Sequence, residues 1–105
     1  MGIQPRMTLH TQLVLKVMLT DVNAERYGLE IARQAGLASG TIYPILARLE
    51  AAGWVSGGWE RIDESKEGRR RRRYYQLTGV GEQEAAAALE STRSWMFPEL
   101  LGATS

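Results

Sequence analysis

The strongest chemical signal in the sequence is a run of five arginines followed by two tyrosines: Arg69, Arg70, Arg71, Arg72, Arg73, Tyr74 and Tyr75. A guanidinium presents a planar fork of donors that matches the oxygens of a phosphate group. If the run forms a strand with Leu77 and Tyr75 facing the core, then Tyr74, Arg72 and Arg70 face outward. Basic runs also serve as solubilising strand edges that block unwanted pairing, or resemble nuclear-import clusters. The elements around the run must therefore decide which role it has.

Groups suited to catalysis or metal binding are scarce elsewhere in the sequence. There is no cysteine, which excludes disulfides, thiol redox chemistry and thiolate metal sites, and there is a single histidine, His10. No acid or nucleophile stands at a useful spacing from His10, and no glycine-rich phosphate loop follows a strand. We therefore predict no catalytic residue, no metal site and no cofactor, and we expect that the chain is not an enzyme.

Length and charge distribution narrow the class of protein further. With 105 residues the chain makes one small domain, whose marginal core favours self-association. The net charge is +1, but residues 54–77 carry seven basic and four acidic groups, whereas residues 78–105 carry one basic and four acidic groups. The sequence has no apolar run of membrane-spanning length and no signal-peptide pattern. We expect a soluble, cytoplasmic protein.

Residues 39–52 have the pattern of an amphipathic helix. Apolar residues recur at steps of three and four, at Ile42, Ile45, Leu46 and Leu49. The opposite face is small and polar with a single guanidinium, so no bulky side chain would keep it out of a DNA groove. Taken alone, an ordinary core helix with a solvated outer face is the more common interpretation. Pro44 predicts a loosened stretch at residues 40–43, because proline lacks a donor and restricts the residue before it.

The segments before residue 39 complete a helix-turn-helix pattern. A first helix is predicted from a cap at Thr8 to about Leu19, and a second from about Glu25 to Gln34. Gly36 ends the second helix, and Ser39 is a good cap for the third. Two short helices joined by a glycine-containing turn are typical of helix-turn-helix modules, although many helical hairpins share the pattern.

A hairpin is predicted directly after these helices. Residues 54–62 have the pattern of a strand, residues 63–68 of a polar turn, and residues 69–77 of the returning strand. A hairpin in this position is a wing, and the arginine run then lies at its tip. This coincidence favours DNA binding over simple solvation of the basic run, because the wing follows a helix shaped for a groove.

The first and last helices indicate self-association. The first helix is apolar nearly all round, so we expect a second chain to cover the side that the domain's own core does not. A final helix capped by Thr78 carries an apolar and small-residue stripe without an obvious partner in the chain. The predicted dimer interface comprises Leu13, Val17, Leu89, Trp95 and Met96. The alternatives are that the first helix is a central core helix of a monomer and that the last helix folds back on its own domain.

Two segments carry a resemblance to a known family. Residues 41–55, TIYPILARLEAAGWV, and residues 68–78, GRRRRRYYQLT, strongly resemble the recognition helix and wing of the PadR family of bacterial transcriptional regulators. The resemblance covers about residues 8–81, and the short C-terminal segment is similar to the branch with a single dimerisation helix. One departure is Thr78-Gly79-Val80-Gly81, where the family commonly has T-P-E-G.

The resemblance implies a winged helix-turn-helix homodimer that usually represses transcription. The implied fold is mainly α with a small β-hairpin, divided into a DNA-binding domain at 1–77 and a C-terminal dimerisation helix and tail at 78–105. The implied DNA-binding residues are Ser39, Gly40, Thr41, Tyr43, Arg48, Arg69, Arg70, Arg71, Arg72 and Arg73. The expected partners are a palindromic operator in double-stranded DNA and a second copy of the chain, with no membrane.

The resemblance also implies a candidate effector site. Some single-helix members bind flat, hydrophobic and often cationic compounds between aromatic side chains at the dimer interface, and Trp95 lies in the corresponding helix. Its indole could stack on such a ligand, or it could simply fill the dimer core. The alternative function for the whole chain is a winged-helix protein-interaction module without specific DNA binding, whose arginines would face an acidic partner.

Overall fold

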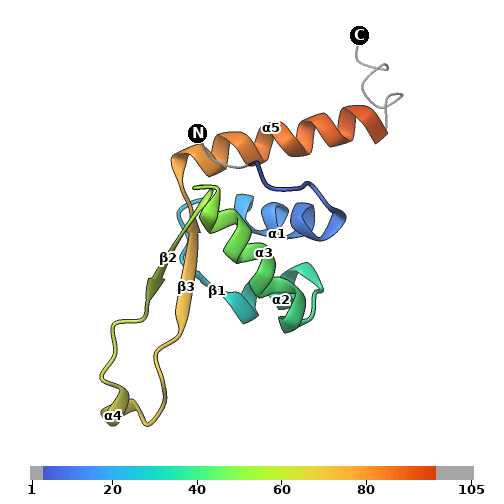
Figure 1. Cartoon of the computed structure of the whole chain (residues 1–105). Helices are drawn as coiled ribbons and strands as arrows, with labels where there is room; N and C mark the ends of the chain where they lie inside the picture. The colour runs from blue at the N-terminus through green and yellow to red at the C-terminus, as the bar shows by residue number, and fades with distance from the viewer. Residues whose placement is uncertain (1–3, 97–105) are drawn as a thin grey trace.

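Three helices, a small sheet, a one-turn helix in its hairpin and one long final helix make up the fold (Figure 1). The computed structural model describes residues 4–96, and for residues 94–96 it describes the backbone only. In chain order the elements are α1 (Leu9–Leu19), β1 (Arg26–Tyr27), α2 (Gly28–Ala35), α3 (Ser39–Ala51), β2 (Val55–Trp59), α4 (Glu64–Glu67), β3 (Arg73–Leu77) and α5 (Gly79–Met96). This architecture confirms the predicted winged helix-turn-helix with a C-terminal helix. Among the described helices, none combines the length and the hydropathy needed to cross a membrane.

The core lies where α1, α2 and α3 meet one face of the sheet. Thr8 caps α1 as predicted, because its hydroxyl oxygen accepts from the Thr11 amide at 3.2 Å. The buried core residues are Val14, Leu15, Met18, Ile31, Ala32, Ile42, Ile45, Leu46, Leu49, Trp54, Val55, Tyr75, Leu77 and Ala85. The four residues predicted as the apolar stripe of residues 39–52 are all in this set.

The predicted start of the second helix is wrong. Arg26 and Tyr27 form the short strand β1, which pairs antiparallel with Tyr75 and Tyr74 of β3, and α2 begins only at Gly28. A pairing with a strand nearly fifty residues further along the chain therefore overrides the local helical pattern. The end of α2 is as predicted, because Gly36 has a left-handed φ of 73°, a conformation that glycine adopts at little cost.

The third helix spans the predicted residues, but two local expectations about it are wrong. Ser39 is the first helical residue rather than the cap, and the Ala38 carbonyl accepts from the amides of Thr41 and Ile42 at 3.0 and 3.1 Å. Residues 40–43 are regular helix in spite of Pro44. The hydrogen bond that Pro44 cannot make would have gone to the carbonyl of Gly40, and Gly40 is an exposed residue in the first turn of the helix.

The sheet has the strand order β1-β3-β2, so the returning strand of the hairpin is its centre. Val55 pairs with Leu77, and Trp59 pairs with Arg73 at the outer end. Both strands are shorter than predicted, and the expected polar turn contains the one-turn helix α4, capped by the Asp63 carboxylate. We call residues 55–77 the wing; Figure 1 shows it extending away from the helices with α4 at its tip.

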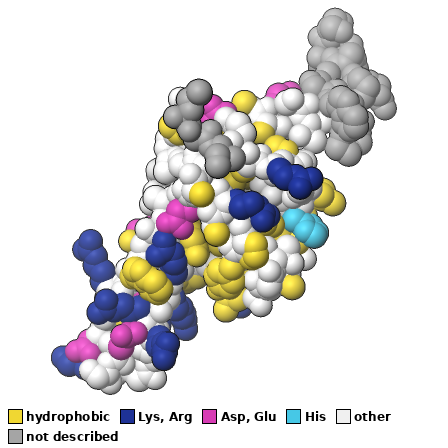
Figure 2. Space-filling model, in the orientation of Figure 1, with side chains coloured by type: hydrophobic (Ala, Val, Ile, Leu, Met, Phe, Trp, Pro, Cys, Tyr) yellow, Lys and Arg dark blue, Asp and Glu magenta, His cyan; other side chains and the backbone are white. Residues whose placement is uncertain are grey.

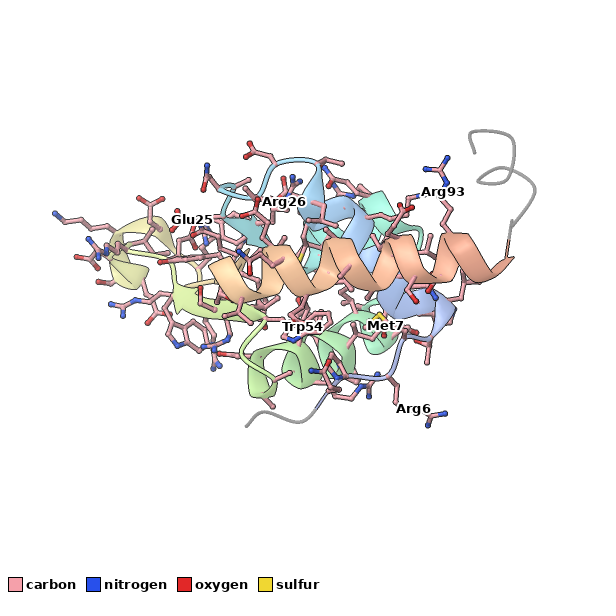
Figure 3. The ribbon with its side chains drawn as sticks, turned by 90° about the horizontal axis from the view of Figure 1, so that it is seen from above. Arg6, Met7, Glu25, Arg26, Trp54 and Arg93 are labelled. Carbon is pink, nitrogen blue, oxygen red and sulfur yellow. The ribbon has the colours of Figure 1, made fainter. Side chains whose placement is uncertain are left out.

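The final helix lies across the top of the domain, over Trp54 and beside Met7 (Figure 3). Its predicted cap is confirmed, since the Thr78 hydroxyl oxygen accepts from the Gly81 amide at 2.9 Å. The expectation that this helix lacks a partner within the chain is wrong as far as Leu89. Ala85 is fully buried, and Leu89 packs against the core, because α5 contacts α1 and β3.

Candidate nucleic-acid interface

The outer face of α3 is exposed and made of small side chains. Pro44, Ala47 and Ala51 are exposed along it, so this part of the helix surface carries only short side chains. Among the predicted DNA-binding residues of this helix, the exposed ones are Ser39, Gly40, Tyr43 and Arg48, whereas Thr41 is half-buried. A slim helix with one cation and few large groups has the dimensions needed to enter the major groove, which is about 12 Å wide.

Tyr43 connects α3 to the start of α2. Its ring covers Gly28 so closely that a Cβ on Gly28 would lie 2.6 Å from Tyr43 Cε1. Tyr43 as a residue is nevertheless 43% exposed, so part of it remains available to a ligand. Gly28 is therefore a packing requirement for the position of the Tyr43 ring on the exposed surface.

The arginine run divides into residues with different roles, and Arg73 is the clearest structural member. Its Nη2 atom donates to Glu50 Oε2 at the end of α3 at 2.6 Å. Its guanidinium also lies 5.4 Å from the ring centroid of Trp59 and 5.7 Å from that of Tyr75. An arginine held by a carboxylate and two aromatic rings braces the wing against α3, and it has little freedom to follow a phosphate.

Arg69 is also committed to a partner within the wing. Its Nη1 and Nη2 atoms donate to Glu60 Oε1 and Oε2 at 2.7 and 2.9 Å, in the two-pronged geometry that carboxylates and guanidiniums favour. The Arg69 side chain is 35% exposed and that of Glu60 only 14%. This hydrogen bond from Arg69 is the main reason that the pKa of Glu60 is lowered from 4.5 to about 2. Glu60 is therefore ionised at neutral pH, and it cancels the charge of Arg69.

Arg70, Arg71 and Arg72 are exposed, and their guanidiniums form no ion pair with any described side chain. The Arg71 amide donates to the Glu64 carboxylate at 2.8 Å, and the Arg72 guanidinium lies 5.8 Å from the centroid of the Tyr27 ring. Figure 2 shows basic side chains gathered over the wing, interspersed with acidic ones. Of the five predicted arginines, these three therefore have the freest charges.

A cavity of about 570 Å³ joins the wing to the helices. It is lined from α2, α3 and the wing, and Tyr27 and Arg33 contribute to it together with Tyr43, Arg71 and Arg72. Tyr27 and Arg33 are not among the site residues predicted from the sequence. Arg33 could have been found, because it lies on the face of α2 opposite buried Ile31, whereas the position of Tyr27 depends on the unpredicted strand β1. A basic cavity with aromatic side chains in its lining thus lies between α3 and the wing, the two elements predicted to bind DNA.

The residues predicted for the dimer interface lie on α1 and α5. Leu13, Val17 and Leu89 are half-buried within the single chain, and Val17 and Leu89 pack against its own core. The side chains of Trp95 and Met96 lie outside the described part of the structure. Within residues 4–93 no three His, Asp or Glu side chains come close enough together to hold a metal ion.

Comparisons with known proteins agree with this architecture. A family model described as "Transcriptional regulator PadR-like family" matches residues 14–87. The crystal structure of AbfR of Staphylococcus epidermidis is 27% identical, with a TM-score of 0.66 over 89% of this chain and 58% of that one. A structure of overoxidized AbfR bound to DNA is 26% identical, with a TM-score of 0.67 over 93% of this chain and 66% of that one.

A PadR family transcription regulator from Clostridium difficile R20291 is similar over nearly its whole length. It is 22% identical, with a TM-score of 0.65 over 92% of this chain and 98% of that one, a likeness that shows the fold alone. This chain spans 58% of the length of the AbfR structure above. No curated protein matches the sequence.

Proposed function

Because the chain belongs to the PadR-like family of transcriptional regulators, we propose that it binds duplex DNA sequence-specifically and represses transcription as a homodimer. The family comprises transcriptional regulators and not enzymes, which agrees with the absence of a catalytic motif from the sequence. A regulator of transcription acts where the DNA is, so we place the protein in the cytoplasm.

The observation that carries the proposal is the continuity of two surfaces suited to DNA. Tyr43, at the edge of the exposed face of α3, lines the same cavity as the exposed arginines Arg71 and Arg72, and Arg33 of α2 also lines it. A helix in the major groove would place these guanidiniums beside the flanking phosphates, and the wing tip could reach the adjacent minor groove. A structural neighbour, AbfR, is described as bound to DNA, which supports the same use of this fold.

In a homodimer, two α3 helices would enter successive major grooves, which gives a palindromic site with half-sites about 34 Å apart. We propose Leu13 and Val17 of α1, together with Leu89, Trp95 and Met96 of α5, as interface residues. Release of the DNA by a small hydrophobic or aromatic effector that contacts Trp95 is part of the proposal. It is tested by adding flat aromatic compounds to the protein–DNA complex while tryptophan fluorescence and bound DNA are measured.

The test of DNA binding uses the two outward arginines. We expect that replacing Arg70 and Arg72 with Ala weakens binding to duplex DNA. The slope of log K against log salt concentration should become less steep by about 3.6, because a dimer loses four phosphate contacts and each contributes about 0.9 to the slope. The matched control is the double replacement of Arg6 and Arg93, which are exposed and lie at the end of the molecule away from the wing (Figure 3).

The control should leave the salt slope close to that of the wild type. An unchanged slope in the Arg70/Arg72 variant would show that the wing arginines do not contact phosphates. If the wild type bound no duplex at low salt, the protein-interaction module would become the better explanation. The same arginines should then bind an acidic protein surface.

A further inference from the structure

We propose that Glu60 is a positioning residue, which holds the wing at a fixed orientation to α3 and thereby contributes to DNA sequence specificity without touching DNA. The inference rests on the DNA-binding function proposed above. Glu60 places a carboxylate against Arg69 and Arg72, two of the arginines predicted to contact phosphates.

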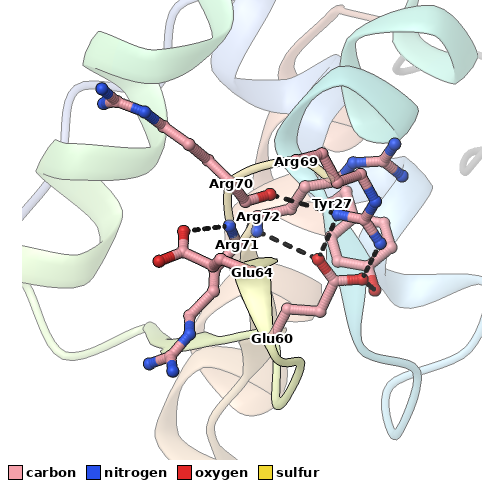
Figure 4. A network of polar contacts seen from close by, with 7 residues as sticks. All are labelled: Tyr27, Glu60, Glu64, Arg69, Arg70, Arg71 and Arg72. Atoms are coloured by element: carbon pink, nitrogen blue, oxygen red, sulfur yellow. Dashed lines mark hydrogen bonds and ion pairs between the residues drawn. The ribbon is translucent and has the colours of Figure 1, made fainter. Parts of the chain in front are cut away.

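Four hydrogen bonds saturate the Glu60 carboxylate (Figure 4). Oε1 accepts from Arg69 Nη1 at 2.7 Å and from the Arg72 amide at 3.1 Å. Oε2 accepts from Arg69 Nη2 at 2.9 Å and from the Tyr27 hydroxyl at 3.1 Å. A carboxylate has about four lone-pair sites, so all of them are used. Glu60 therefore ties together three segments: the outgoing side of the wing, its returning side, and β1.

The hydrogen bond from the Tyr27 hydroxyl connects the wing to α3, the predicted recognition helix. Tyr27 directly precedes α2, and its neighbour Gly28 is in close contact with the Tyr43 ring of α3. A continuous series of contacts thus runs from Glu60 through Tyr27 and Gly28 to Tyr43. Because the Glu60 amide also donates to the Arg72 carbonyl at 2.9 Å, the ladder between the two sides of the wing extends past the end of β2.

Electrostatics alone would oppose a carboxylate at this place. Glu60 adds a negative charge next to the predicted phosphate contacts and removes Arg69 from the set of free cations. Both effects weaken binding to any duplex, whatever its sequence. A rigid wing, by contrast, improves the match to one DNA shape over others, since shape and register carry sequence information. The geometric contribution of Glu60 should therefore appear as a change in specificity, separate from the change in overall affinity that its charge causes.

The experiment compares Glu60→Gln, Tyr27→Phe and Glu67→Gln with the wild type. Binding is measured by fluorescence anisotropy over a range of salt concentrations, with a duplex selected by the wild type and a scrambled duplex of equal length. Glu67→Gln is the matched control, because Glu67 is exposed at the wing tip and its carboxylate forms no hydrogen bond or ion pair with any described residue.

Glu60→Gln should bind the scrambled duplex more tightly, with a salt slope steeper by about 0.9 per subunit as Arg69 becomes free. Its preference for the selected duplex should fall about tenfold, the effect of one mismatched base pair. Tyr27→Phe keeps the charge, so its slope should remain unchanged while its preference falls. Glu67→Gln should raise both affinities by the same factor and keep the preference.

The proposal is overturned if Glu60→Gln and Tyr27→Phe both keep the wild-type preference, since Glu60 would then act only as a charge. Hydrogen exchange of the Arg72 amide, measured by NMR, gives an independent result: exchange should accelerate in Glu60→Gln and not in Glu67→Gln. If Glu60→Gln did not fold, Tyr27→Phe, which lacks a single hydroxyl, would decide the outcome. A wild type that binds neither duplex would instead overturn the DNA-binding function itself, and this inference with it.

Discussion

Replacing Gly81 with Ala should strongly destabilise the protein, because the start of α5 rests directly on the backbone of the segment before β2. A Cβ at Gly81 would lie 1.8 Å from the Trp54 carbonyl oxygen and 2.6 Å from its carbon. That oxygen is also held by the Thr78 amide at 2.9 Å, and Trp54 is buried. Neither side of the contact is a flexible side-chain end, so a backbone segment must move by more than an ångström or so to relieve the clash.

Overpacking of a close-packed interior costs about 1–3 kcal/mol, and a clash between two backbone segments belongs at the upper end. For a domain of this size, about 3 kcal/mol lowers the melting temperature by roughly 12–24 °C. The assay is thermal unfolding followed by circular dichroism at a single protein concentration, because self-association makes the melting temperature depend on concentration.

Gly79→Ala is the matched control for this prediction. Gly79 lies in the same helical turn, but a Cβ there would meet nothing within 4 Å. Alanine is a better helix former than glycine by up to about 1 kcal/mol, so this variant should melt at or above the wild-type temperature. If Gly81→Ala melted within about 2 °C of Gly79→Ala, the close packing of α5 on Trp54 would be refuted.

Two further predictions concern the wing. Replacing Arg73 with Ala removes its ion pair with the end of α3 and its contact with Trp59. We therefore expect the free energy of unfolding, measured in urea, to fall by about 1–2 kcal/mol while the salt slope of DNA binding stays the same. Arg70→Ala should instead make the salt slope less steep and leave the free energy of unfolding unchanged. The pKa of Glu60 is lowered to about 2, first of all by the hydrogen bond from Arg69. A carboxyl with a lowered pKa stabilises the fold above its ordinary pKa and loses that effect in acid. The urea midpoint should therefore fall less steeply between pH 4.5 and 2 in Glu60→Gln than in the wild type.

The helical half of the fold could be predicted because its signals are local. The stripe at Ile42, Ile45 and Leu49 repeats with the period of a helix, and Thr8 and Gly36 mark helix ends through their own chemistry. The strand β1 gave no such signal. Two residues contain no periodicity, and what makes them a strand is pairing with β3 much further along the chain.

The arginine run shows a similar limit for the candidate site. Five identical neighbours contain no information about which of them is neutralised within the fold. The partner of Arg73 is Glu50 on another element, and the partner of Arg69 is Glu60 across the wing. The role of all five arginines as DNA contacts remains a prediction. The structure adds the distinction between two braced guanidiniums and three exposed ones.

The most direct measurement of the central claim, that α3 and the wing of two copies grip one duplex, is selection from a random duplex library by the purified wild-type chain at low salt. We expect enrichment of one palindromic sequence, with half-sites about one helical turn, or 34 Å, apart, and two chains bound to each duplex. Retention of no duplex at all, or binding by a single chain without any enriched sequence, would contradict the account.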